Sequence, residues 1–193
     1  MFIVISVIEF LLFICFSINI IYLLFFSVMS CKKCEKNADP ISVYKKIAIL
    51  IPAYREDKVI LECVNSCLQQ NYPKEAYDVV VISDRMKDET NNYLSSLPIE
   101  LVKVFFENST KSKALNLAME QIGDYDIALV LDADNTIEND FLCQINEIFA
   151  NPSVQIVQAH RTAKNTNTNM ALLDAVSEEI NNSIFRKGHV NAG

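Results

Sequence analysis

The sequence is poor in glycine, with only three among its 193 residues, at positions 123, 188 and 193. This scarcity excludes the loops G-x-G-x-x-G and G-x-x-x-x-G-K-[ST], whose glycines let backbone amides approach a phosphate closely. If the protein binds a nucleotide, it must therefore hold the phosphates with side chains or with a bound metal ion.

Charged residues are missing from the N-terminal region. None lies between Phe10 and Cys31, and only Glu9 precedes them. A membrane-spanning helix needs about 20 predominantly apolar residues, and this run supplies them. Residues 1–31 are therefore predicted to form a single-pass anchor, with residues 3–29 in contact with membrane lipid. A secretory or lipoprotein signal peptide is disfavoured, because no Lys or Arg precedes the run.

The segment that follows the anchor, residues 32–45, is a lysine-rich linker. Short flanks rich in Lys and Arg stay on the cytoplasmic side, so the rest of the chain is predicted to face the cytoplasm at the cell membrane. The formal net charge is −7, and because residues 1–46 contain five lysines against three acidic residues, the remainder carries −9. Such an acidic domain is a poor partner for nucleic acid.

The six cysteines favour a reducing compartment with free thiols. Cys31 and Cys34 have the spacing of half a zinc site, but no second Cys or His pair completes it, so free thiols are the favoured interpretation. Cys63 and Cys67 lie four residues apart in a predicted helix, which places them on one face, and both are expected to line the core.

Apolar strand-like runs alternate with helical patterns from residue 46 to the end of the chain. Such alternation predicts βαβ units and a Rossmann-like, mostly parallel sheet with helices on both faces. The predicted strands are 47–53, 78–82, 101–106, 126–131 and 154–158. The predicted helices are 57–70, 89–97, 111–122, 140–150 and 170–185, with Ser109 or Thr110 capping the third. Residues 188–193 are expected to form a polar stretch without a helix or strand.

Polar residues follow three of these strands where the strands end. They are 53–56, Asp84, and the pair Asp132 and Asp134. In open parallel sheets ligands bind at the carboxyl ends of the strands, and Mg²⁺ or Mn²⁺ prefers one or two carboxylates together with phosphate oxygens. The alternative for the aspartate pair is an ordinary solvated turn.

Four motifs in this order resemble the family 2 inverting glycosyltransferases. They are IPAYRE at 51–56, VISD at 81–84, KALN at 113–116 and DAD at 132–134. The resemblance covers residues 46–193 and implies a GT-A fold, a nucleotide-sugar donor and a saccharide or lipid-linked acceptor. With its N-terminal anchor, the chain is similar to the membrane-bound synthases of cellulose, hyaluronan and poly-N-acetylglucosamine.

The resemblance also implies roles for single residues. Ala53, Tyr54 and Glu56 are expected to lie against the nucleoside. Asp84 is expected to contact the base, and since a carboxylate can accept a hydrogen bond from the imide N–H of uracil, UDP is the expected nucleotide. Lys113 would help to hold the nucleotide. Asp132 and Asp134 would bind the donor and its Mg²⁺ or Mn²⁺, which offsets charge on the departing diphosphate.

Inverting transfer also needs a general base for the acceptor hydroxyl, and in the family that carboxylate comes later, followed by Gln-x-x-Arg-Trp. The chain has no Trp, and Asp174, Glu178 and Glu179 come too early, so the base is expected beyond Gly193. The chain would then be the donor-binding half of a longer enzyme, or a non-catalytic nucleotide-sugar-binding subunit.

A third alternative comes from residues 129–136, which also resemble the first motif of haloacid-dehalogenase-type phosphatases. There the residue matching Asp132 is a nucleophile and the one matching Asp134 an acid. In those proteins the motif follows the first strand, whereas here it follows the fourth, which favours the transferase.

Overall fold

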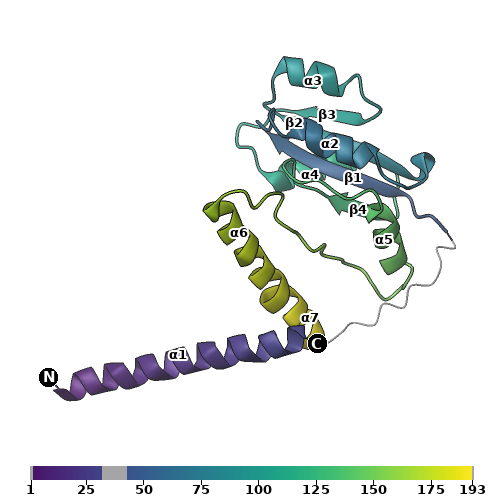
Figure 1. Ribbon diagram of the computed structural model, residues 1–193. Coiled ribbons are helices and arrows are strands. Elements are labelled where there is room, and N and C mark those ends of the chain that lie inside the picture. Colours follow the sequence, from purple (N-terminus) through teal and green to yellow (C-terminus); the bar gives the residue numbers. More distant parts are fainter. Residues whose placement is uncertain (1, 32–42, 193) are drawn as a thin grey trace. The chain divides into compact units, whose positions relative to one another are not determined.

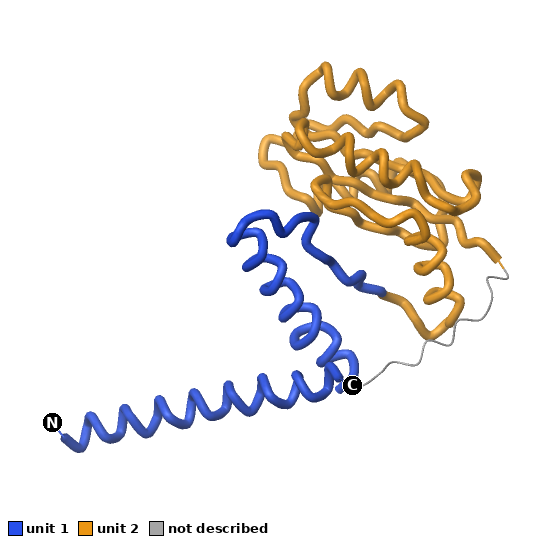
Figure 2. The backbone as a smooth tube through the Cα atoms, viewed as in Figure 1, with its two compact units in different colours: residues 1–37, 157–193 blue, residues 38–156 orange. Residues whose placement is uncertain are grey.

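The computed structural model describes residues 2–31 and 43–192. The chain forms two compact units, one of residues 1–37 and 157–193 and the other of residues 38–156 (Figure 2). Cys34 and most of the lysine-rich linker lie outside the described residues, so the predictions made for them stay predictions.

The unit of residues 38–156 is built on a parallel sheet of four strands in the order β3-β2-β1-β4 (Figure 1). The strands are β1 (Ile47–Tyr54), β2 (Tyr77–Asp84), β3 (Glu100–Val104) and β4 (Ile127–Val130). β1 and β2 are almost wholly buried, as expected for parallel strands covered on both faces. The predicted α/β fold is confirmed.

Helices cover the two faces of this sheet. They are α2 (Ile60–Leu68), the 3₁₀ turn η1 (Lys74–Ala76), α3 (Asp88–Leu94), α4 (Lys111–Gln121) and α5 (Phe141–Ile148). Ala114 and Ala118 of α4 pack in a cluster with Leu50 of β1 and Ile82 of β2. Because successive side chains of a strand point to opposite faces, the residues that alternate with Leu50 in β1 and with Ile82 in β2 lie on the other face of the sheet.

Helix α2 contacts β2. Its buried residues include Cys63 and Cys67, which are 1 % and 0 % exposed. The prediction that these two cysteines line the core is therefore confirmed.

The start of α4 is fixed by a side-chain cap. Thr110 Oγ1 accepts a hydrogen bond from the Lys113 backbone N–H at 3.2 Å, which satisfies one of the amide groups that a helix N-terminus leaves without a partner. This confirms the predicted helix start and orients the first turn of α4.

The predicted fifth strand at 154–158 is wrong. These residues have no regular secondary structure, and the Ile156 side chain is 90 % exposed. Valine and isoleucine favour a strand locally, but a strand also needs a neighbour for its backbone hydrogen bonds. No strand in the described part of the chain pairs with this segment.

The other unit contains α1 (Phe2–Ser30), α6 (Asn169–Ile180), the π-helix η2 (Asn181–Gly188) and α7 (His189–Ala192). α1 is long and apolar enough to cross a membrane, judged by length and composition. The predicted helix at 170–185 is present but continues to Ala192, so the prediction of a stretch without a helix after residue 187 is wrong. Its cause is a contact distant in sequence, because Gly188 packs directly against Phe26 of α1.

Candidate functional site

A cavity of about 420 Å³ lies at the carboxyl ends of β1 and β2, beside the first turn of α4 and the loop after β4. The residues that line it are Pro52, Ala53, Tyr54, Glu56, Ile82, Asp84, Ser109, Thr110, Lys111, Ala114, Asp132, Ala133 and Asp134. The cavity gathers six of the seven predicted site residues, all except Lys113. That these residues bind a ligand stays a prediction.

The backbone turns sharply at the end of both central strands. Tyr54 and Asp84 are partners in the parallel register, and the residue after each, Arg55 and Arg85, has a positive φ of 57° and 54°. The Arg55 backbone N–H donates to the Asp84 carbonyl at 3.2 Å. A left-handed conformation costs about 1–2 kcal/mol for a residue with a Cβ, so the structure accepts strain at the edge of the cavity.

Two polar atoms in the cavity wall have unmet hydrogen-bonding capacity. Asp84 is only 3 % exposed, and among the described residues its Oδ1 has no hydrogen-bond partner, nor has the buried Oγ of Ser109. A buried acceptor without a partner costs about 1–3 kcal/mol. A ligand with an N–H group above Asp84 would remove that cost.

Lys111 brings positive charge to the same cavity. Its ammonium forms an ion pair with Asp132 Oδ1, and it lies at the N-terminus of α4, where the helix dipole also favours an anion. Both side chains are about half exposed, and such pairs contribute only about 0–1 kcal/mol. The ammonium can therefore exchange Asp132 for a phosphate at little cost.

Lys113, which the sequence suggested, points elsewhere: its Nζ donates to the Asn108 carbonyl at 3.1 Å, and it does not line the cavity. A signal for Lys111 was present, because it lies three and seven residues before Ala114 and Ala118, the small residues of α4 that pack on the sheet. That spacing puts Lys111 on the sheet side of the helix.

The aspartate pair offers a partial metal site. Asp132 and Asp134 both line the cavity, and no cluster of three or more His, Cys, Asp or Glu side chains occurs within residues 2–31 and 43–192. Two carboxylates suit a hard divalent cation that takes its other ligands from phosphate and water. The residues present therefore fit Mg²⁺ or Mn²⁺ held together with a diphosphate.

Asp57 links the segment after β1 to the start of α3. Its Oδ1 accepts hydrogen bonds from the Thr90 hydroxyl at 2.7 Å and from the Lys87 backbone N–H at 2.9 Å. The bond from Thr90 is the main reason why the pKa of Asp57 lies below its ordinary value of 3.8. The ionised form is thus favoured in the folded state, and its contribution is present above the ordinary pKa and lost as pH falls through the lowered one.

Asp57→Asn is therefore expected to lower the free energy of unfolding at neutral pH. In acid, the difference in free energy of unfolding between the wild type and the variant is expected to become smaller. Urea unfolding followed by circular dichroism from pH 7 downward measures this, with the exposed Glu75→Gln as the control. A difference between wild type and Asp57→Asn that stays constant down to pH values below about 4 would contradict the assignment.

Comparisons with known proteins find related sequences and a related fold. The sequence profile described as "Glycosyltransferase like family 2" matches residues 45–187. Poly(ribitol-phosphate) beta-N-acetylglucosaminyltransferase TarS of Staphylococcus aureus is 28 % identical over 101 residues, which is 50 % of this chain and 18 % of TarS. Beta-monoglucosyldiacylglycerol synthase of Trichormus variabilis is 29 % identical over 129 residues, 64 % of this chain and 27 % of that protein.

Among solved structures, the mannosyltransferase PcManGT from Pyrobaculum calidifontis, in complex with GDP-Man and Mn²⁺, matches with a TM-score of 0.57 and 24 % identity. The match covers 72 % of this chain and 44 % of that one, and it supports the fold. The chain thus spans roughly a fifth to a quarter of the length of the two curated relatives.

Proposed function

The chain belongs to glycosyltransferase family 2, and from that membership we propose that its cavity binds a nucleotide sugar, with UDP as the nucleotide, for inverting transfer to a saccharide or lipid-linked acceptor. The observation that carries the proposal is that Asp84 Oδ1 has no hydrogen-bond partner within residues 2–31 and 43–192, in a cavity that Lys111, Asp132 and Asp134 also line. A buried acceptor and a set of charged groups in one cavity suit a ligand with a base and a diphosphate.

The nucleoside would occupy the part of the cavity between the ends of β1 and β2. Asp84 can accept the imide N–H of uracil, while Pro52 and Ala53 provide apolar wall for a flat ring. Tyr54 is 44 % exposed at the end of β1, and the Arg55 guanidinium lies over its ring at 5.2 Å from the centroid, so the base would stack on the face of the ring away from Arg55. Glu56 lines the same end of the cavity and can accept a ribose hydroxyl.

The diphosphate would lie between the first turn of α4 and the aspartate pair. Lys111 and the positive end of the α4 dipole supply charge on one side. A divalent cation, when bound, would offset the charge on the departing diphosphate. Asp132 and Asp134 would hold that cation, and release of Lys111 from Asp132 would free its ammonium for a phosphate oxygen. Lys111 takes the role first expected of Lys113.

No described carboxylate is proposed as the general base. Glu178 accepts hydrogen bonds from Arg161 and Arg186, and Glu179 is paired with His160. A carboxylate engaged with a guanidinium is a weak base, since the Arg161 contact lowers the pKa of Glu178.

A second candidate function, a subunit that binds nucleotide sugar without transferring it, therefore stays open. Family membership leaves the phosphatase alternative without support.

We further propose that α1 anchors the protein in the cell membrane, with the cavity on the cytoplasmic side. Its 29 residues extend about 43 Å at about 1.5 Å per residue, enough to cross a hydrocarbon core of about 30 Å. None of its residues is fully buried.

The test is a calorimetric titration of the detergent-solubilised chain with UDP, GDP and CDP in the presence of Mn²⁺. UDP is expected to bind at least about tenfold more tightly than GDP. Uracil presents its imide N–H to Asp84 on a single ring, whereas guanine carries a second ring and cytosine has no imide N–H. Equal affinity for all three nucleotides would contradict the assignment of Asp84 to the base. Incorporation of radiolabelled sugar from UDP-sugars into polymer or lipid separates the enzyme from the binding subunit.

A further inference from the structure

The C-terminal helices pack on the last turns of α1. The Phe26 ring stacks on the His189 imidazole, with centroids 3.7 Å apart and planes 9° from parallel. The Tyr22 hydroxyl lies 2.9 Å from His189 Nε2, and Asn191 Nδ2 donates to the Met29 carbonyl at 3.0 Å. Tyr22, Phe26 and Met29 are spaced four and three residues apart, so they share one face of α1.

Gly188 makes this contact close. A Cβ at that position would lie 2.5 Å from the Phe26 carbonyl oxygen, a distance that side chains do not adopt. The two helices therefore meet backbone to backbone at Gly188, and a larger residue there would push η2 away from α1.

The contact fixes the depth of the C-terminal helices relative to a bilayer. Tyr22, Phe26 and Met29 lie in the last third of the apolar run, next to the lysines that mark its cytoplasmic end. Tyrosine is enriched at this level, where the hydrocarbon meets the headgroups. If α1 spans the membrane, whatever packs on these residues lies in the interface between lipid and water.

Helix α6, which runs directly into η2, has an exposed apolar face. Leu172, Val176 and Ile180 recur at intervals of four residues with Leu173 beside them, which is one stripe of a helix. All four side chains are about half exposed or more: Leu172 52 %, Leu173 64 %, Val176 51 % and Ile180 47 %. Unpartnered apolar stripes of this kind mark interaction surfaces.

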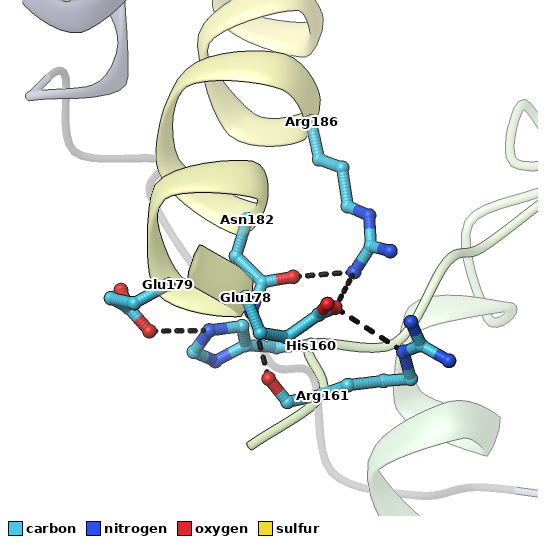
Figure 3. A network of polar contacts seen from close by, with 6 residues as sticks. All are labelled: His160, Arg161, Glu178, Glu179, Asn182 and Arg186. Atoms are coloured by element: carbon cyan, nitrogen blue, oxygen red, sulfur yellow. Dashed lines mark hydrogen bonds and ion pairs between the residues drawn. The ribbon is translucent and has the colours of Figure 1, made fainter. Parts of the chain in front are cut away.

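The opposite face of the same helix is occupied by polar contacts within the unit (Figure 3). Glu178 accepts hydrogen bonds from Arg161 Nε at 3.3 Å and Arg186 Nη1 at 3.0 Å. Asn182, which is 6 % exposed, donates to the Arg161 carbonyl at 2.7 Å and accepts from Arg186. This network ties residues 160–161 to one side of the helix and leaves the apolar stripe on the other.

We propose that α6 lies in the membrane interface with the stripe Leu172, Leu173, Val176 and Ile180 in contact with lipid acyl chains. The inference rests on the proposed membrane anchoring of α1 and extends it to a second lipid contact. The occupant of the stripe is the bilayer, because the helix is continuous with a segment held at headgroup level by α1. Amphipathic helices bind membranes in this way, with the apolar face at the boundary of headgroups and acyl chains.

The absence of tryptophan in the chain permits a direct test with single tryptophans as fluorescent probes. Val176→Trp places the probe on the stripe, and Leu173→Trp is a second variant on the same face. Asp174→Trp, near Glu178 on the opposite side of α6, is the matched control, and Phe16→Trp reports on α1 itself. Each full-length variant is reconstituted into phosphatidylcholine and phosphatidylglycerol vesicles whose acyl chains are brominated near the headgroups or near their ends.

Lipid brominated near the headgroups is expected to quench the fluorescence of Val176→Trp and Leu173→Trp at least about twofold more than that of Asp174→Trp. The reason is that the stripe would lie at the boundary of headgroups and acyl chains. Lipid brominated near the chain ends should quench Phe16→Trp. Quenching of Phe16→Trp with none at positions 173 and 176 would overturn the inference and leave the anchor intact, since the stripe would then be covered by protein or exposed to water. Absence of quenching at all four positions would overturn the anchoring as well.

Discussion

Asp134→Asn is expected to weaken UDP binding in the presence of Mn²⁺ by about 100-fold, or roughly 2.7 kcal/mol. Without Mn²⁺, the variant and the wild type should bind UDP equally weakly. The Asp134 side chain lies on the cavity wall beside Asp132, and a neutral amide loses the charge that makes a carboxylate a good ligand for a hard cation. Calorimetric titration of the full chain with UDP, with and without Mn²⁺, measures both effects.

Glu138→Gln is the matched control for this substitution. It makes the same change of charge four residues along the chain, on an exposed residue outside the cavity, and should leave the affinity unchanged. Since Asp134 is exposed as well, the free energy of unfolding should change by no more than about 0.5 kcal/mol. Full Mn²⁺-dependent affinity in Asp134→Asn would remove this residue from the proposed metal site.

Asp84→Asn is expected to have opposite effects on binding and on stability. UDP affinity should fall at least about tenfold, because the amide is a poorer acceptor for the imide N–H of uracil. The free energy of unfolding should rise by about 1 kcal/mol, because a buried carboxylate oxygen without a partner becomes a neutral one. Asp84 is 3 % exposed and its Oδ1 is unpartnered among the described residues, which is the reason for expecting a gain.

Urea unfolding by circular dichroism and calorimetry with UDP measure the two effects on the same sample. The exposed Asp124→Asn, on the loop before β4, is the control and should change neither. A purely structural role for Asp84 predicts loss of stability together with loss of binding, so a destabilised Asp84→Asn would contradict its assignment as a ligand group.

The general form of the site could be predicted because parallel strands end at the same edge of a sheet. The carboxyl ends of β1, β2 and β4 lie at one edge of the sheet, and the residues after them come close together because β2 and β4 both neighbour β1. The structure places Tyr54 and Asp84 in direct register and brings both to the cavity with Asp132. Local pattern was sufficient here because the sheet itself does the positioning.

The motif at 113–116 alone does not decide between Lys111 and Lys113. The two residues lie about 200° apart around the helix, so only one of them can face the cavity. Which one does so depends on how α4 is rotated against the sheet, and the packing of Ala114 and Ala118 decides it. The motif at 113–116 contains Lys113, whereas the lysine that lines the cavity is Lys111.

The missing strand at 154–158 and the extended C-terminal helix have a common explanation. In both places the local sequence favours one secondary structure and the protein adopts another. The presence or absence of a contact distant in sequence decides which of the two forms. Ile156 has strand propensity, but the segment has no pairing partner in the part of the chain that the structure describes, and His189–Ala192 remain helical where Gly188 meets Phe26. Local periodicity indicates neither the missing pairing of residues 154–158 nor the contact of Gly188 with Phe26.

The central claim is that Asp132 and Asp134 hold a divalent cation together with a nucleoside diphosphate. Electron paramagnetic resonance of Mn²⁺ tests it most directly, because the signal of the free ion weakens when the ion is bound. We predict that the chain alone changes the Mn²⁺ signal little, that chain and UDP together weaken it well beyond UDP alone, and that Asp134→Asn abolishes the difference. A signal that is the same for UDP with and without the wild-type chain would contradict the claim.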